Sequence, residues 1–159
     1  MTGTDTTMSR IEAAVTLHRE GDPGAARDRL AEIWLEISPD GDAFHRCVLA
    51  HYMADVQPEP QDELAWDLRA LEAADSLTDE RVRAHHASLA VRGFYPSLHL
   101  NLASSYDKVG DGDRAREHLD RARTYLDALG DDSYGDGIRA AIERLAKRLA
   151  ERLDGAGAE

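Results

Sequence analysis

The sequence predicts an all-α fold, and three observations support this prediction. Ala, Leu, Arg, Glu and Asp dominate the 159 residues, while aromatic residues make up only 6% of them, a composition that suits helices. Apolar residues recur at intervals of three and four, and no segment alternates as a half-buried strand does. Clusters of Gly, Pro and Asp divide this pattern into segments of helical length. We therefore predict a single domain over residues 1–159, with seven to eight helices packed as antiparallel pairs.

The first helix pair is predicted over residues 9–37. Ser9 begins a capping box, in which its hydroxyl would accept a hydrogen bond from the first turn. Gly21 ends the first helix. Asp22 then caps the second, which starts at Pro23, a position where the missing N–H of proline costs nothing.

Two further pairs are predicted over residues 42–75 and 96–129. Pro58 and Pro60 cannot lie inside a helix, so the two helices of the second pair should be separated there. Residues 110–112, with the sequence Gly-Asp-Gly, divide the third pair in the same way.

Residues 79–93 are predicted to form an additional helix that the pairs do not account for. Its apolar residues are also spaced by three or four, and this stripe must be buried because a short isolated helix is marginal in water. Gly93 and Pro96 should break the helix, with Pro96 in the first turn of the next one. We expect this segment to fold back against the pairs at 42–75 and 96–129.

A last helix is predicted over residues 134–153. It starts near Ser133, and Ile142, Leu145 and Leu149 would line its buried face. Its other face is charged, as in a helix that covers the end of a core.

The third pair contains small and large apolar residues at offsets that recur in the first pair. The residues of the third pair are Leu102, Ala103, Tyr106, Ala115, Leu119 and Ala122. Those of the first pair are Ala13, Ala14, Leu17, Ala26, Leu30 and Ile33. A looser copy in the second pair consists of Leu49, Ala50, Met53, Leu64, Leu68 and Leu71. Small residues at these positions would let two helices approach closely, while bulky ones would fill the space to a neighbouring pair.

This pattern resembles the tetratricopeptide repeat (TPR), whose unit carries W-x2-L-G-x2-Y followed by A-x3-F. His99 stands where the tryptophan would be, and Ala103 replaces the glycine. The resemblance implies a right-handed superhelix of about three repeats over residues 9–129, with residues 134–153 as a capping helix.

Charge and cysteine content exclude several classes of function. The formal net charge is −12, which disfavours nucleic acid and anionic membrane surfaces as partners. Cys47 is the only cysteine, so an intrachain disulfide is impossible, and a small core residue is the favoured interpretation of it. No apolar stretch resembles a secretory signal or a membrane span, which predicts a cytoplasmic protein.

No group of residues indicates catalysis, so the sequence predicts neither an enzyme nor a cofactor. His45 and His51 are six residues apart on one predicted helix and therefore on different faces, unlike the i, i+4 pair of a helical zinc site. His99 is expected in the core, and no metal site is predicted. Trp34 and Trp66 should pack between repeats.

The resemblance also implies a function. Arrays of this family usually hold an extended or helical segment of another protein in a concave groove lined by their first helices. Carrying those positions over predicts a partner-binding groove formed by Ile11, Val15, His18, Arg19, Cys47, His51, Asp55, Ser97, Leu100, Asn101, Ser104, Asp107 and Lys108. The favoured function is therefore a protein–protein interaction module. The alternatives are a homodimeric scaffold and, less favoured, a histidine-based binder of a metal or small ligand.

Overall fold

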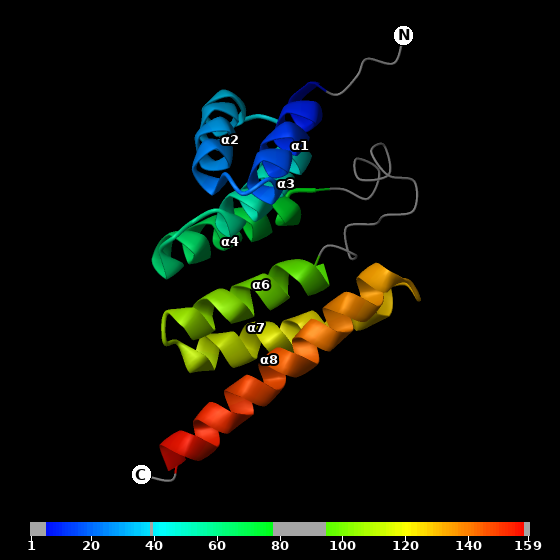
Figure 1. The fold of residues 1–159 in the computed structure, drawn as a ribbon. Helices are drawn as coiled ribbons and strands as arrows, with labels where there is room; N and C mark the ends of the chain where they lie inside the picture. Colours follow the sequence, from blue (N-terminus) through cyan, green and yellow to red (C-terminus); the bar gives the residue numbers. More distant parts are fainter. Residues whose placement is uncertain (1–5, 39, 78–94, 158–159) are drawn as a thin grey trace. The chain divides into compact units, whose positions relative to one another are not determined.

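The computed structural model describes residues 6–38, 40–77 and 95–157, and all regular structure within them is helical (Figure 1). Seven α-helices and one short 3-10 helix lie in these ranges, which confirms the predicted all-α fold. The chain divides into two compact units, residues 1–77 and 78–159, and we describe each by itself. That they form one domain stays a prediction, and the additional helix expected at 79–93 lies outside the described residues.

Unit 1 consists of two helix pairs. Its helices are α1 (Thr6–Arg19), α2 (Pro23–Ile37), α3 (Ala43–Asp55) and α4 (Pro60–Asp75). The predicted caps are present at α2, where the Asp22 carboxylate accepts a hydrogen bond of 3.0 Å from the Ala25 amide, and Pro23 is the first helical residue. Gly21 has a φ of 94°, which lets the chain reverse direction between α1 and α2.

The predicted start of the first helix is wrong by three residues. The helix α1 begins at Thr6, so Ser9 lies inside it and does not cap it. Met8 is half-buried and extends the apolar stripe of Ile11 and Val15 by one turn, so the helix continues N-terminally beyond the expected cap.

The core of unit 1 joins the two pairs. Buried side chains from α1, α2 and α3 form one cluster, which consists of Ile11, Ala14, Val15, Ala26, Leu30, Ile33, Leu49, Met53 and Val56. The indole rings of Trp34 on α2 and Trp66 on α4 meet edge to face, with centroids 5.0 Å apart. This confirms the predicted packing of both tryptophans between repeats.

The register predicted for the second helix of the second pair is wrong. Leu68 is 40% exposed, whereas Ala70 and Ala73 are buried. Apart from Asp67, the buried residues of α4 are alanines, which let α4 pack closely on α3. The leucines fit the sequence pattern, but the helix is rotated so that its alanines make the contact.

Unit 2 consists of one helix pair and a long last helix. Its elements are α6 (Tyr95–Lys108), α7 (Gly112–Thr124), the 3-10 helix η2 (Leu126–Ala128) and α8 (Ser133–Gly157). Pro96 is the second residue of α6, which confirms its predicted place in the first turn. The helix α8 packs against both α6 and α7 and buries Ile142, Leu145 and Leu149.

Small residues lie at the predicted helix crossings of both units. Ala26, Ala103, Ala115 and Ala122 are all fully buried. His99, at the position of the repeat tryptophan, is 4% exposed, so its predicted core placement is confirmed.

Candidate functional site

The residues predicted to line a partner-binding groove lie on three helices, α1, α3 and α6. Five of them are buried: Ile11, Val15, Cys47, Leu100 and Asp107. The others are half-buried or exposed: His18, Arg19, His51, Asp55, Ser97, Asn101, Ser104 and Lys108. On α1 and α3 the accessible members are therefore those of the last turns. That these residues form one groove stays a prediction.

The accessible residues of α6 form a single polar stripe. Apart from Tyr95 at its start, every residue of this helix is buried except Ser97, Asn101, Ser104 and Lys108. Their spacing of three to four residues places them on one face. We call these four residues the α6 stripe.

The last helix contacts both ends of α6. The Tyr134 hydroxyl lies 3.1 Å from Ser97 Oγ, and the Arg152 guanidinium pairs with the buried Asp107 carboxylate. Because the start of α8 meets the start of α6 and its later turns meet the end of α6, the two helices run parallel. The predicted groove residues Ser97 and Asp107 thus contact the chain's own last helix.

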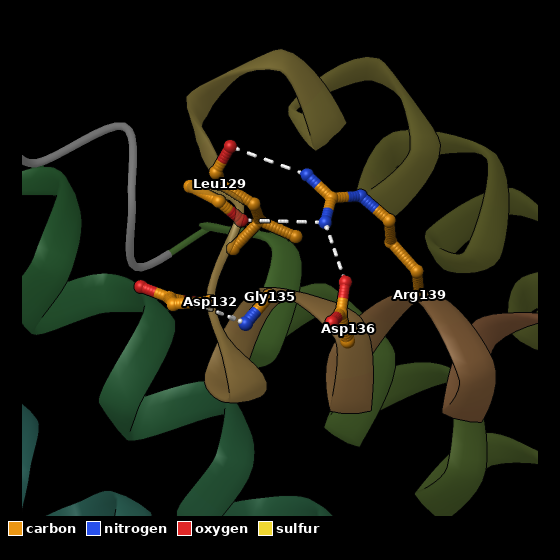
Figure 2. A network of polar contacts seen from close by, with 6 residues as sticks. Leu129, Asp132, Gly135, Asp136 and Arg139 are labelled. Carbon is orange, nitrogen blue, oxygen red and sulfur yellow. Dashed lines mark hydrogen bonds and ion pairs between the residues drawn. The ribbon is translucent and has the colours of Figure 1, made fainter.

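A network of polar contacts fixes the start of α8 (Figure 2). The Asp132 carboxylate accepts a hydrogen bond of 2.7 Å from the Gly135 amide and so caps the helix. Arg139 donates to the carbonyl groups of Leu129 and Gly130, over 3.2 and 3.3 Å, and pairs with Asp136. The guanidinium therefore joins the first turns of α8 to the segment that follows η2.

Gly135 permits the close approach of this segment. A Cβ atom built on Gly135 would lie 2.3 Å from the Gly130 carbonyl oxygen, which is far inside van der Waals contact. The sequence Gly-Asp-Gly at 135–137 lies inside α8, within the range predicted for the last helix. The glycine is needed for packing there and not for a backbone reversal.

Aromatic rings and two histidines fill the space between α6 and α7. His99 Nδ1 and His118 Nδ1 are 3.0 Å apart, and the rings stack at 5.2 Å between centroids. Tyr125 stacks on His99, and Tyr106 stacks on His118. Burial and the nearby Arg121 lower the pKa of His118.

A pocket of about 310 Å³ opens between α1 and α2. Its apolar floor is made of Ala13, Ala14, Leu17 and Ile33, and its charged rim is made of Arg10, Arg29 and Glu32. Arg10 also donates two hydrogen bonds to Glu36. This hydrogen-bonded pair raises the pKa of Arg10, and the nearby Glu32 acts in the same direction.

This pocket contains none of the residues predicted to line the partner-binding groove. The sequence nevertheless contains a signal for this pocket. The apolar patterns of the first and third pairs are 89 residues apart. At the same offset, Arg10 corresponds to His99, Arg29 to His118 and Glu36 to Tyr125. Extending the repeat comparison beyond the apolar positions would have revealed that charged residues replace rings.

The cysteine and histidines of unit 1 do not form a reactive group. Burial, assisted by Asp75, raises the pKa of the Cys47 thiol to about 12, so the thiolate that a nucleophile needs is absent at neutral pH. Burial also lowers the pKa of His51. Within the described ranges, no group of three or more His, Cys, Asp or Glu side chains could hold a metal ion. Among the same residues, no helix is long and apolar enough to cross a membrane.

Comparison with known proteins identifies the helix pairs. A family model described as the tetratricopeptide repeat matches residues 7–32 and 96–121. No curated protein and no solved structure matches the chain. The two segments fall on α1–α2 and α6–α7, the pairs whose apolar offsets agree, and the predicted resemblance is confirmed there. The chain is therefore similar to the tetratricopeptide-repeat family over one segment in each of its two units.

Proposed function

We propose that this protein is a non-enzymatic interaction module that binds a peptide or protein segment along the first helices of its repeats. Tetratricopeptide repeats generally mediate protein–protein interaction, and the observation that carries the proposal here is the α6 stripe. A helix that is otherwise buried leaves only this row of side chains accessible.

The chemistry of the stripe suits recognition of a polypeptide backbone. Asn101 has both a donor and an acceptor, the hydroxyl of Ser104 can act as either, and Lys108 adds a positive charge. Main-chain amide and carbonyl groups of an extended or helical segment would form hydrogen bonds with Asn101 and Ser104. An acidic side chain of the partner would form an ion pair with Lys108.

Site-directed photo-crosslinking tests this proposal. A photoreactive amino acid placed at Lys108 or Arg19, both exposed, should capture one discrete segment of a partner in an extract of the native cell. The same group at the exposed Asp113 of α7 is the matched control and should capture none. The captured segment, made as a synthetic peptide, should bind the Asn101→Ala chain at least about fivefold more weakly than the unaltered chain. Equal capture from Asp113 and Lys108, or no capture from any position, would contradict the proposal.

Self-association is the second candidate function, and the side chain that supports it is Leu35. This leucine on α2 is 81% exposed, although single exposed apolar residues are common on monomers. Light scattering of the unaltered chain and of Leu35→Lys distinguishes the two functions. A concentration-dependent dimer that Leu35→Lys dissociates would favour the homodimeric scaffold.

A further inference from the structure

The pocket between α1 and α2 lies at positions that are filled differently in the two matched repeats. In α6–α7, the repeat-equivalent positions hold His99, His118 and Tyr125, whose rings stack on one another. In α1–α2, the same positions hold Arg10, Arg29 and Glu36. In unit 1 the rings are thus absent, and a pocket of about 310 Å³ lies between α1 and α2.

The floor of the pocket is suited to an apolar group. Ala14 and Ile33 are buried members of the core, while Leu17 is half-buried and Ala13 is exposed. An incoming ring would cover these side chains and remove their apolar surface from water, which is favourable. The volume is at the lower end of the range for ligand pockets, so one aromatic side chain fits better than a large ligand.

The charges at the rim favour a carboxylate next to that ring. Arg10 is neutralised within the protein, because it is hydrogen-bonded to Glu36 and Glu32 lies near it. Arg29 makes no hydrogen bond or ion pair with any residue that the structure describes. Its guanidinium is thus the one cation at this rim whose charge no described side chain balances by direct contact, on a chain whose net charge is −12.

We propose that this pocket is a second binding site, which takes a segment of a partner protein by one aromatic side chain on the floor and a carboxylate against Arg29. The site is separate from the groove of the proposed function, since the two share no residue. An experiment can therefore disprove either proposal while the other stands.

Nuclear magnetic resonance of the full ¹⁵N-labelled chain tests the site with a defined probe. The probe is the blocked dipeptide acetyl-Glu-Trp-amide, for which we expect a Kd on the order of 1 mM, given its small size. Its amide shift changes should concentrate on Ala13, Leu17, Arg29 and Ile33. Acetyl-Gln-Trp-amide and acetyl-Glu-Ala-amide, which lack the charge and the ring, should each bind about threefold more weakly or worse.

Two variants and one matched control complete the test. Arg29→Gln should weaken binding about threefold and remove its dependence on salt. Ala13→Trp should abolish binding, because the new ring fills the pocket from an exposed position and leaves the fold intact. Arg148→Gln removes an exposed charge of α8, outside both the pocket and the predicted groove, and should change nothing.

Three outcomes would overturn the proposal. The first is the absence of shift changes at the pocket up to 10 mM probe, about ten times the expected Kd. The second is binding that Ala13→Trp leaves unchanged. The third is a change of oligomeric state in Ala13→Trp, measured by sedimentation, which would assign the pocket to a second copy of this chain.

Discussion

At the scale of single residues, the helix crossings depend on alanines with no room around them. Ala115 is fully buried where α7 meets α6. Replacing it with leucine adds atoms to a packed crossing, and we expect the free energy of unfolding to fall by about 1–3 kcal/mol. Denaturant unfolding followed by circular dichroism measures the change. Asp120→Leu, on the exposed side of the same helix, should change it by less than about 0.5 kcal/mol.

Two glycines of α8 should respond to alanine in opposite directions. At Gly135 the added methyl group meets the Gly130 carbonyl oxygen at 2.3 Å, so the capping segment must move and we expect a loss of about 1–3 kcal/mol. At Gly137 nothing lies within 4 Å, so alanine should stabilise the helix by up to about 1 kcal/mol. Thermal melts of the two variants provide the comparison. A loss of stability in Gly137→Ala equal to that in Gly135→Ala would show that α8 does not start as described.

The buried histidines should make the protein less stable at mildly acidic pH. The pKa values of His118 and His51 are lowered in the folded protein, so below the ordinary value of about 6.5 the unfolded chain binds more protons than the folded one. The free energy of unfolding therefore falls as the pH drops through about 6.5, and this fall ends below the lowered pKa values. The contact between His99 Nδ1 and His118 Nδ1 acts in the same direction, since it can hold one proton but not two.

Denaturant titrations between pH 8 and pH 5 measure this slope. A His51→Gln, His118→Gln double variant should be less stable at pH 8, because it alters packed rings, but should show a smaller loss on acidification. A slope that is the same in both proteins would contradict the assignment of these two histidines.

At the scale of elements, local signals were informative at the turn between α1 and α2 but not at Ser9, which lies inside α1. Gly21, Asp22 and Pro23 specify the turn between α1 and α2 through properties of single residues, and the structure has each where it was expected. The tryptophans were also predictable, because large rings on the second helices of two successive pairs have few alternatives to packing between the pairs. The register of α4 was not predictable, since two sets of apolar residues, leucines and alanines, satisfy the same helical period.

Contacts between distant residues of unit 2 could not be predicted from spacing at all. Arg152 and Asp107 are 45 residues apart in the sequence. Without knowledge of the fold, each would be predicted to be an exposed charged residue. The pocket of unit 1 escaped notice for a related reason. Charged residues stand there in place of the rings of the other repeat, among them Arg10 at the tryptophan position of the family pattern, and a charged residue at such a position does not by itself indicate a pocket.

The attachment of α8 to α6 leads to a prediction at this scale. Removing the Arg152 side chain leaves the Asp107 carboxylate buried without its partner, and we expect a loss of about 1–3 kcal/mol. Arg148→Ala removes a neighbouring exposed arginine of the same helix and should be nearly neutral. If Asp107→Asn restores most of the stability of Arg152→Ala, the loss came from the unpaired charge. Chemical denaturation of the four proteins makes this comparison.

At the scale of the whole molecule, two repeats of one pattern differ in what fills the space between their helices. The matched repeat of unit 2 fills the space between its helices with its own rings, and that of unit 1 leaves it open behind charged side chains. The net charge of −12 makes copies of the chain repel one another, and a dimer would have to overcome this repulsion. An acidic partner would meet less repulsion at Arg29, whose charge no described side chain balances by direct contact.

The parallel course of α8 along α6 has a consequence for assembly. Consecutive first helices of a repeat array run parallel, so α8 lies where the first helix of another pair would stack, and its outward side carries exposed charged residues such as Arg144 and Lys147. Stacking through this face would have to displace a helix of 25 residues. A solenoid is an open-ended architecture that can polymerise from any uncovered end. In unit 2, α8 therefore covers the face of α6 and α7 on which another helix pair would stack.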